Sequence, residues 1–477
     1  MLKSSEPRRQ RKEPPTGAKD RHEKTARIGG NGLSNKTTDI GTQRIDREAA
    51  CQEQATGTPK KPLMGKKKYH NLYGQLLERP RLRAAFGRVK LKRGAPGSDG
   101  VIIEEFEKKL EENLTELIGE LRRKEYRPRP IRRVEIPKRN GGKRKLGIPS
   151  VRDRVVQDCL RDILEKVFEP TFSEHSHGFR PKRGCFTALR DLFLQIREGG
   201  VNIVDVDIEK CFDTIPHEPL IDAVAEEVAD GSILQLIRII LTAPIDEGYR
   251  YVKRKEGLGV PNEGTAQGSP VSPLLANIYL AQLDRELEAK GISFSRYADD
   301  IRATTRRGRE VRQIKGVIGE KLKAMGLTMS PTKTKLTTAE RGVNYLGYRL
   351  SLFRKKTYAV IPRDRVNAFK ERVKTLTRRN SHLSPADRVK ALGSYVTGWG
   401  EYFKRAQQPQ LFYNLDRWIY RRVIAMYAGR WRTWLFVKYP IWQFRELGLG
   451  SLYRMHKEYF NGPWVPKTKR ATSSCSA

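Results

Sequence analysis

Hydrophobic and polar residues alternate along the stretch "VNIVDVDI", which begins at residue 201. Successive side chains of a β-strand point to opposite faces, so Val204, Val206 and Ile208 would share one face. Asp205 and Asp207 would then project together from the other face. The pattern predicts a strand that buries one face and carries two carboxylates on the other.

A second stretch, "FSRYADDIRAT" (294–304), reads as a strand, a turn and another strand, with Asp299 and Asp300 in the turn. "VNYLGYRLS" (343–351) is predicted as one more strand. The period of 3.6 residues in "SPLLANIYLAQLDRELEAK" (272–290) predicts a helix. The central part of the chain therefore mixes short strands with helices.

From about residue 362 the pattern becomes helical throughout. Helices are predicted in "RVNAFKERVKTL", "SPADRVKALGSYVTGWGEYF" and "LDRWIYRRVIAMY". The second of these begins with Ser384 as its N-cap and Pro385 in its first turn. At the other end, residues 1–66 are rich in Lys, Arg, Gly, Thr and Pro and lack a periodic apolar pattern, which predicts a basic, disordered leader.

The patterns predict an α+β protein of four parts. The leader is followed by a mixed region at 67–361, a helical region at 362–430 and a short basic C-terminal segment at 431–477. We expect the last segment to bind nucleic acid, because residues 365–477 carry 22 Lys and Arg against 6 Asp and Glu.

The charge of the whole chain points to a polyanionic partner. Its 94 Lys and Arg against 55 Asp and Glu give a formal net charge of +39, which favours nucleic acid. An acidic membrane surface is the alternative, but no apolar run reaches spanning length and no short amphipathic helix gathers the basic residues. We therefore expect no membrane partner.

The cysteines and the N-terminal composition indicate a reducing compartment. None of the five Cys forms a C-x-x-C pair, so neither a zinc site nor a disulfide framework is indicated. The N-terminus has no hydrophobic signal region, and its acidic residues are unlike a transit peptide. We expect a cytoplasmic protein of bacterial type, associated with the nucleoid, rather than an organellar one.

Adjacent carboxylates repel one another, so Asp299 and Asp300 need a nearby source of positive charge or solvent. Pairing of the two strands would bring both close to Asp207. Two divalent ions held by hard oxygen ligands are what phosphoryl transfer requires. The alternative is a solvated turn, since Asp favours turns. Asp205 shares the face of Asp207.

Further stretches occur in an order known from one family. They are "GAPGSDG", "IPKRNGGKRKLGIPSVRDRVVQ", "FEPTFSEHSHGFRPKRGCFTAL", "VDVDIEKCFDTIPH", "GTAQGSPVSPLLANIYLAQLD", "RYADD", "LTMSPTKTKL", "NYLGYRL", "GSYVTGWGEYF" and "NLDRWIYRRV". From about 69 to 459 the chain resembles the group II intron-encoded reverse transcriptases, or maturases, of the type that lacks an endonuclease module. After residue 430 only His456 and Cys475 remain as candidate ligands, so we expect that module to be absent.

The resemblance implies a right-hand polymerase, with fingers and palm at 67–361 and a helical thumb, or maturase domain, at 362–430. It implies Asp207, Asp299 and Asp300 as catalytic residues that hold two Mg²⁺ ions, with Mn²⁺ as a substitute. Because the motif position is Asp207, Asp205 is interpreted as structural. The residues that it implies for nucleotide binding are Arg132, Lys138, Arg144, Phe212 (the aromatic gate against a ribose 2′-hydroxyl), Gln267, Gly268 and Lys333, with Lys335 close to the last. The basic residues expected to face nucleic acid are Lys404, Arg405, Arg421 and Arg422.

The function that the resemblance implies is RNA-directed DNA synthesis together with splicing and retrohoming of the intron. Its partners would be the group II intron RNA, an RNA template, a DNA primer or target, and dNTP. A splicing cofactor without polymerase activity and a retron or CRISPR-associated reverse transcriptase are the alternatives. One departure from the family stands out: after "YADD", the strand "IRATTRR" is more polar than the usual apolar sequence.

Overall fold

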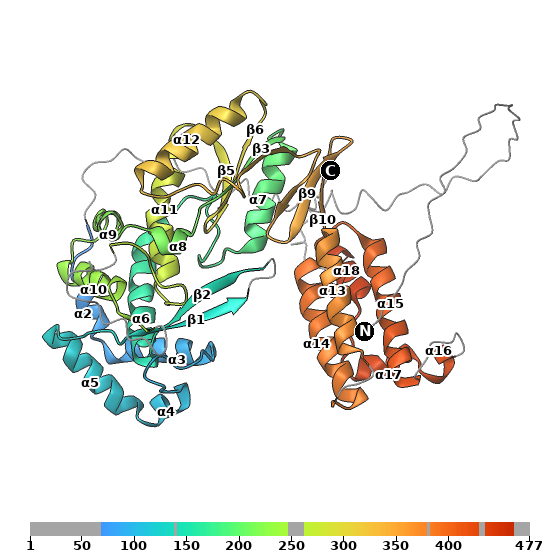
Figure 1. Ribbon diagram of the computed structural model, residues 1–477, viewed down its shortest axis with the longest axis horizontal. Helices are drawn as coiled ribbons and strands as arrows, with labels where there is room; N and C mark the ends of the chain where they lie inside the picture. The colour runs from blue at the N-terminus through green and yellow to red at the C-terminus, as the bar shows by residue number, and fades with distance from the viewer. Residues whose placement is uncertain (1–67, 138–140, 247–261, 379–381, 429–434, 462–477) are drawn as a thin grey trace, which may run out of the picture. The chain divides into compact units, whose positions relative to one another are not determined.

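The computed structural model describes residues 68–137, 141–246, 262–378, 382–428 and 435–461 (Figure 1). The predicted leader and Lys138 lie outside these residues. Over the described part of the chain, helices and strands are mixed up to residue 360 and only helices follow, which confirms the predicted α+β class. Within the described ranges, none of the helices has the length and apolar character that a membrane span requires.

The first region surrounds one long buried helix. This helix, α6 (Val151–Phe168), is capped by Ser150, whose hydroxyl oxygen accepts from the backbone N–H of Asp153. It packs most extensively against α3 (Arg79–Leu91). The other helices of this region are α2 (Leu72–Leu76), α4 (Ile103–Lys108) and α5 (Leu110–Arg123). The antiparallel hairpin of β1 (Ile131–Pro137) and β2 (Lys143–Ile148) precedes α6, and β4 (Ile245–Asp246) extends it.

The central sheet has the strand order β5-β6-β3-β7. Its members are β3 (Asn202–Asp207), β5 (Ser293–Tyr297), β6 (Asp300–Thr305) and β7 (Lys335–Thr338). All neighbouring pairs are antiparallel. The strand predicted from the alternation at 201–208 is therefore present, and it lies inside the sheet with a partner on each side.

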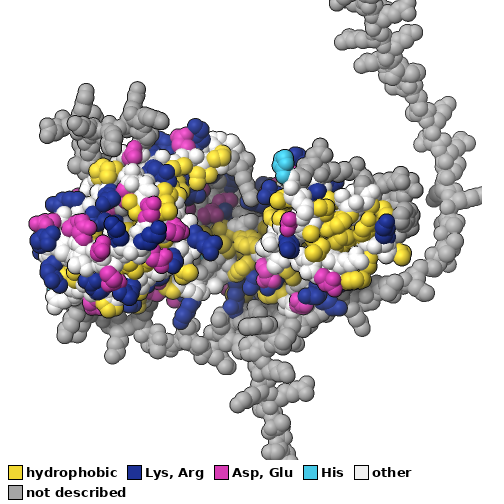
Figure 2. Space-filling model, turned by 90° about the horizontal axis from the view of Figure 1, so that it is seen from below, with side chains coloured by type: hydrophobic (Ala, Val, Ile, Leu, Met, Phe, Trp, Pro, Cys, Tyr) yellow, Lys and Arg dark blue, Asp and Glu magenta, His cyan; other side chains and the backbone are white. Residues whose placement is uncertain are grey.

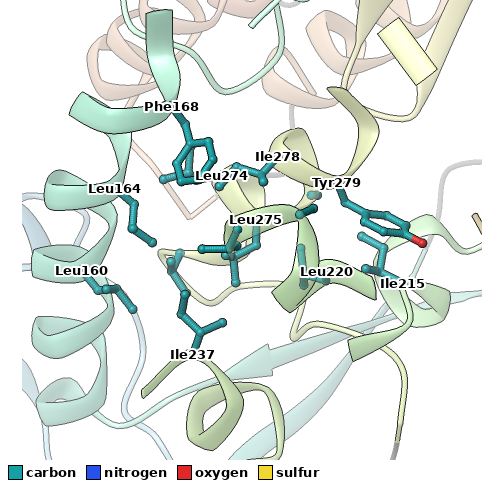
Figure 3. Packing of buried hydrophobic residues seen from close by; sticks show 14 of the residues in the cluster. Leu160, Leu164, Phe168, Ile215, Leu220, Ile237, Leu274, Leu275, Ile278 and Tyr279 are labelled. Atoms are coloured by element: carbon teal, nitrogen blue, oxygen red, sulfur yellow. The ribbon is translucent and has the colours of Figure 1, made fainter. Parts of the chain in front are cut away.

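Helices on this sheet form the core. Both α7 (Cys185–Arg197) and α11 (Ser272–Ala289) contact β5, and α12 (Glu310–Ala324) contacts β3 and β6. Figure 3 shows apolar side chains of α6 and α11 packed against those of α9 (His217–Ala225) and α10 (Gly231–Leu241). The labelled residues there include Leu160, Leu164, Leu275, Leu220 and Ile237, all almost fully buried. This packing fixes the sheet from which the predicted carboxylates project.

A second small sheet has the order β10-β9-β8. The stretch at 343–351, predicted as one strand, forms two: β8 (Val343–Tyr345) and β9 (Tyr348–Phe353). That prediction was wrong because Leu346 (φ 45°) and Gly347 (φ 81°) both adopt the left-handed conformation and make a two-residue hairpin turn. The third strand is β10 (Lys356–Val360).

The helical region begins with α13 (Arg363–Leu376), α14 (Pro385–Phe403) and α15 (Pro409–Ala428). Ser384 caps α14 as predicted, since its hydroxyl accepts from the N–H of Asp387. Three further helices follow: α16 (Leu435–Lys438), α17 (Ile441–Glu446) and α18 (Leu452–Asn461). Of these, α18 packs against α14 and α15, so the described part of 431–477 is continuous with the helical region.

Candidate active site

The register of β3 and β6 places the acidic residues opposite one another. Asp207, at the end of β3, pairs with Asp300, and Asp205 pairs with Arg302. Asp299 lies in the turn just before β6, whereas Asp300, expected in that turn, is already the first residue of the strand. Residues two apart on a strand share a face, so Asp205 and Asp207 face the same side as Arg302 and Asp300. The strands thus gather acidic side chains at one end of the sheet.

A buried arginine holds the turn that carries Asp299. The side chain of Arg296 is fully buried, and its Nη1 donates to the carbonyl oxygen of Ala298, 3.1 Å away. Its Nε and Nη2 donate to the two carboxylate oxygens of Asp284 at 2.7 and 2.5 Å. Ala298 itself adopts a left-handed conformation (φ 57°). Sequence reasoning did not identify Arg296 and Asp284, although they fix the backbone next to Asp299.

Two basic side chains form ion pairs with these carboxylates. Lys333 Nζ donates to Asp207 Oδ1 at 2.7 Å, so Lys333 rather than Lys335 contacts the predicted catalytic residue. Arg302 forms ion pairs with Asp300 and Asp205. Burial raises the pKa of Asp299, and the charges of Asp207 and Asp300 raise it further.

Burial also raises the pKa values of the neighbouring carboxyls, those of Asp300 and Asp205. Burial raises the pKa of Asp300, and Arg302 opposes this rise. Burial, only partly offset by Arg302, raises the pKa of Asp205 to about 6. A nearby positive charge stabilises the ionised form of each of these carboxyls. The site therefore favours cations.

The donor chemistry of Asp207, Asp299 and Asp300 fits a divalent ion. Carboxylate oxygens are hard ligands of the kind that Mg²⁺ prefers, and their mutual repulsion would be relieved by a bound cation. In the ranges that the structure describes, no group of three or more His, Cys, Asp or Glu side chains is arranged to hold a metal ion. Lys333 and Arg302 occupy oxygens of Asp207 and Asp300 instead.

Three aromatic rings stand beside the turn. Phe212, in the short helix α8 (Cys211–Thr214), meets the ring of Phe179 edge to face, with centroids 6.4 Å apart. Phe179 also lies 6.3 Å from the ring of Tyr297. It is 53% exposed and has φ 58°, an unusual conformation for a bulky residue. Phe179 therefore links the predicted gate residue to the strand that leads into the turn.

The predicted nucleotide-binding residues of β2 and of the loop before α11 meet. Arg144 Nε donates to Gln267 Oε1 at 2.7 Å, and the N–H of Gly147 donates to the backbone oxygen of Gln267 at 2.7 Å. Gly268 has φ 121°, and a Cβ there would lie 2.3 Å from the oxygen of Gly147. Only glycine fits at this approach. Arg132, on β1, has a buried Nε with no hydrogen-bond partner among the described residues.

The basic residues expected to face nucleic acid use their side chains within the protein. Lys404 pairs with Glu401, and the guanidinium of Arg405 stacks 3.8 Å from the ring centroid of Phe186. Arg422 donates to the hydroxyl of Thr377, at 3.1 Å from Nε and 2.9 Å from Nη2. Arg421 is exposed and also has an interaction partner. The structure does not gather these four with the carboxylates.

The two histidines of "SEHSHGF" contact one carboxylate. His175 Nδ1 and His177 Nε2 lie 3.1 and 3.0 Å from carboxylate oxygens of Asp191. Burial alone would raise the pKa of Asp191, but hydrogen bonds from both histidines lower it to about 2. The loop that carries Phe179 is thereby fixed to α7.

Two protein families match the chain. Residues 136–350 match "Reverse transcriptase (RNA-dependent DNA polymerase)", and residues 366–441 match "Group II intron, maturase-specific domain". The first match contains Asp207, Asp299 and Asp300, and the second contains α14 and α15.

Several curated proteins are similar to the chain. The protein YkfC of Escherichia coli K12 is 31% identical over 322 residues, which is 58% of this chain and 82% of YkfC. The group II intron-encoded protein LtrA of Lactococcus lactis is 36% identical over 230 residues, 48% of this chain and 37% of LtrA. An uncharacterised 91 kDa protein in the cob intron of Schizosaccharomyces pombe is 41% identical over 226 residues, 46% of this chain and 26% of that protein. The chain thus spans only about a quarter to two fifths of the length of the last two.

A solved structure, the partial Cas6-RT-Cas1–Cas2 complex, contains a chain that is 22% identical with a TM-score of 0.34. The match covers 56% of this chain and 45% of that chain. A likeness at this level carries no argument about function.

Proposed function

Because the chain belongs to the reverse transcriptases that carry a group II intron maturase-specific domain, we propose that it is an RNA-directed DNA polymerase that also binds its group II intron RNA. It would extend a DNA primer or target on an RNA template with dNTP, and would promote splicing and retrohoming of the intron. We further propose that it acts in the bacterial cytoplasm, at the nucleoid, and that it has no membrane partner.

The observation that carries the proposal is the register of β3 and β6. It sets Asp207 directly opposite Asp300, with Asp299 one residue before the strand. Asp207 and Asp300 are more than 90 residues apart in the sequence, so only the fold brings them together. The matched reverse transcriptase region includes all three carboxylates.

The carboxylates of Asp207 and Asp299 would hold Mg²⁺, with Asp300 beside them and Mn²⁺ as a substitute. A bound divalent ion supplies electrostatic stabilisation for phosphoryl transfer. The ammonium group of Lys333 is paired with Asp207 and ends a flexible side chain. It would move to the primer or to a phosphate if the carboxylate held an ion. No protein group has to act as a nucleophile, because the primer supplies the attacking oxygen.

Other residues would place the incoming nucleotide. The exposed Arg144 can offer two parallel N–H donors to a phosphate, and its bond to Gln267 orients it toward the loop that contains Gly268. Arg132 carries a buried donor that lacks a partner in the described part of the chain. Phe212 would crowd a ribose 2′-hydroxyl and so favour deoxynucleotides. Gly268 permits close backbone approach.

The binding of intron RNA rests on the maturase-specific match and on the charge of the chain. A net charge of +39 favours contacts to the RNA backbone, and structured RNA is recognised mainly by shape and by such contacts. On the face seen in Figure 2, Lys and Arg side chains are spread among acidic ones rather than gathered in one patch. RNA contacts are therefore expected over a wide surface, to which the exposed Arg421 would contribute.

The test is primer extension on an RNA template with Mg²⁺, comparing the native chain with Asp299→Ala. A matched control is Asp222→Ala, which removes an exposed carboxylate from α9. The proposal predicts cDNA from the native chain and from the control, and none from Asp299→Ala. Binding of the intron RNA should be nearly equal in all three. Equal synthesis by Asp299→Ala would overturn the assignment of the site.

A further inference from the structure

Arg302 is a charged residue in β6, the strand that begins with Asp300 directly after Asp299. In β6 it lies two residues after Asp300 and therefore on the same face. Across the strand pair it is the register partner of Asp205, just as Asp300 is the partner of Asp207. One face of the two strands thus carries three carboxylates and this single guanidinium.

The guanidinium is held from three directions. Its Nη1 lies 2.9 Å from Asp205 Oδ1 and also binds Asp300 Oδ1. Its Nη2 donates to the backbone oxygen of Asn344 in β8 at 3.1 Å. The ring of Tyr345 lies beneath it, with the ring centroid 4.9 Å from Cζ. Arg302 is only 5% exposed, so these contacts and not solvent determine where it sits.

A purely structural salt bridge explains this arrangement poorly. Burying the guanidinium gains little stability over a well-packed apolar side chain, because removing its charge from water is unfavourable. An apolar side chain would therefore serve packing equally well. What an apolar residue cannot do is fix the carboxylate of Asp300, which begins the same strand. Arginine can, since its rigid planar donors define the position of a bound carboxylate.

We propose that Arg302 is a positioning residue for the polymerase site: it fixes the carboxylate of Asp300 against β8 and offsets one of the negative charges on this face. Asp207 and Asp299 are then the carboxylates left to hold the divalent ion. Asp205 serves as the second anchor of the guanidinium, in agreement with its interpretation as structural. This inference rests on the proposed polymerase function, because only that function gives the position of Asp300 a consequence.

The test compares Arg302→Met, which keeps length but removes the charge and the donors, with Arg302→Lys, which keeps the charge but lacks the planar donors. The control is Arg309→Met, an exposed arginine just beyond the same strand. Each variant is measured for kcat and for the KM of dNTP in primer extension. Binding of Mn²⁺ is measured in parallel by electron paramagnetic resonance, which does not depend on activity.

We expect Arg302→Met to lower kcat by about 10- to 100-fold, as is usual when a residue that orients a ligand is lost. The KM of dNTP should stay within about twofold of the native value, since Arg302 does not line the predicted nucleotide site. Mn²⁺ should bind at least as tightly, because a positive charge has been removed, and its spectrum should change as Asp300 is released. Arg302→Lys should recover part of the rate, and Arg309→Met should match the native chain.

An unchanged kcat in Arg302→Met would overturn the proposal, as would joint loss of kcat and of Mn²⁺ binding. If Arg302→Met fails to fold, Arg302→Lys decides: a native rate and a native Mn²⁺ spectrum would overturn it. If the native chain itself makes no DNA, the polymerase function has failed. The positioning of Asp300 is then judged from the Mn²⁺ spectra alone, where identical spectra of native chain and variant would contradict it.

Discussion

Replacing Asp284 with Asn should leave the guanidinium of Arg296 buried without its counter-charge. Arg296 is 0% exposed and Asp284 is 1% exposed, so water cannot take over the lost contacts. Removing one partner of such a pair typically destabilises a protein by roughly 3–5 kcal/mol. Because the exposure of both side chains is negligible, solvent screening does not reduce this value. We therefore expect the free energy of unfolding of Asp284→Asn to fall by an amount in that range.

The double variant Asp284→Leu with Arg296→Met separates stability from catalysis. It removes both charges, so its stability should lie within roughly 1–2 kcal/mol of the native value. It also removes the donor to the carbonyl oxygen of Ala298, which precedes Asp299. The double variant should therefore fold normally but synthesise DNA at least about tenfold more slowly, because the turn is no longer held.

Urea unfolding followed by far-ultraviolet circular dichroism is the suitable assay. Tryptophan fluorescence is not, because all six Trp residues lie from Trp399 onward and report only on the C-terminal part of the chain. If the free energy of unfolding of Asp284→Asn falls by less than about 1 kcal/mol, the pair does not behave as a buried one, since exposed ion pairs contribute that much. A native rate of synthesis in the double variant would show that Arg296 does not position the turn.

Four other outcomes are expected. Phe212→Ala should admit ribonucleotides, and Phe179→Ala should do so more weakly. The measurement is the ratio of kcat/KM for dNTP to kcat/KM for NTP. An unchanged ratio in Phe212→Ala would show that Phe212 is not the gate against ribonucleotides. Gly268→Ala should raise the KM of dNTP about tenfold, because φ 121° and the oxygen of Gly147 leave a Cβ strained by roughly 1–3 kcal/mol; a native KM would show that the loop yields. Asp191, whose pKa is lowered to about 2, should confer stability that is present above its unfolded pKa of about 4 and is lost as the pH falls toward 2; urea unfolding of the native chain and of Asp191→Asn should converge over that window, and a constant difference would count against the linkage. His175, whose raised pKa comes first from its hydrogen bond to Asp191, adds stability below about pH 6.5 that is lost as the pH rises through the folded pKa.

Local patterns were sufficient for β3 and for the turn at Asp299, because alternation and turn composition act within a few residues. The predicted approach of Asp207 to Asp300 depended on the pairing of two strands that are distant in the sequence, and the register of β3 with β6 confirms that pairing. The extra turn in "VNYLGYRLS" had a signal, the dipeptide Leu346-Gly347, that the alternation of apolar residues concealed.

The buried charged residues that hold the turn and the carboxylates could not be predicted. Arg296 and Asp284 come from β5 and α11, and neither side chain shows from the sequence that it is buried. The stretch that contains Arg302 was noticed only for its polarity, and Arg302 itself was not identified, because its partners Asp205 and Asn344 lie on other strands. Charged residues are ordinarily exposed, so a buried charged pair is visible only once the fold has placed both partners.

The most direct test of the account is single-nucleotide incorporation, under single-turnover conditions, on a preformed duplex of DNA primer and RNA template. The native chain is compared with Asp207→Asn, which keeps the shape of a carboxylate at the end of β3 but removes its charge. We expect a rate lower by several orders of magnitude with unchanged duplex binding, because charge stabilisation at the reacting phosphate is lost. A native rate in Asp207→Asn would contradict the assignment of polymerase chemistry to the carboxylates of β3 and β6.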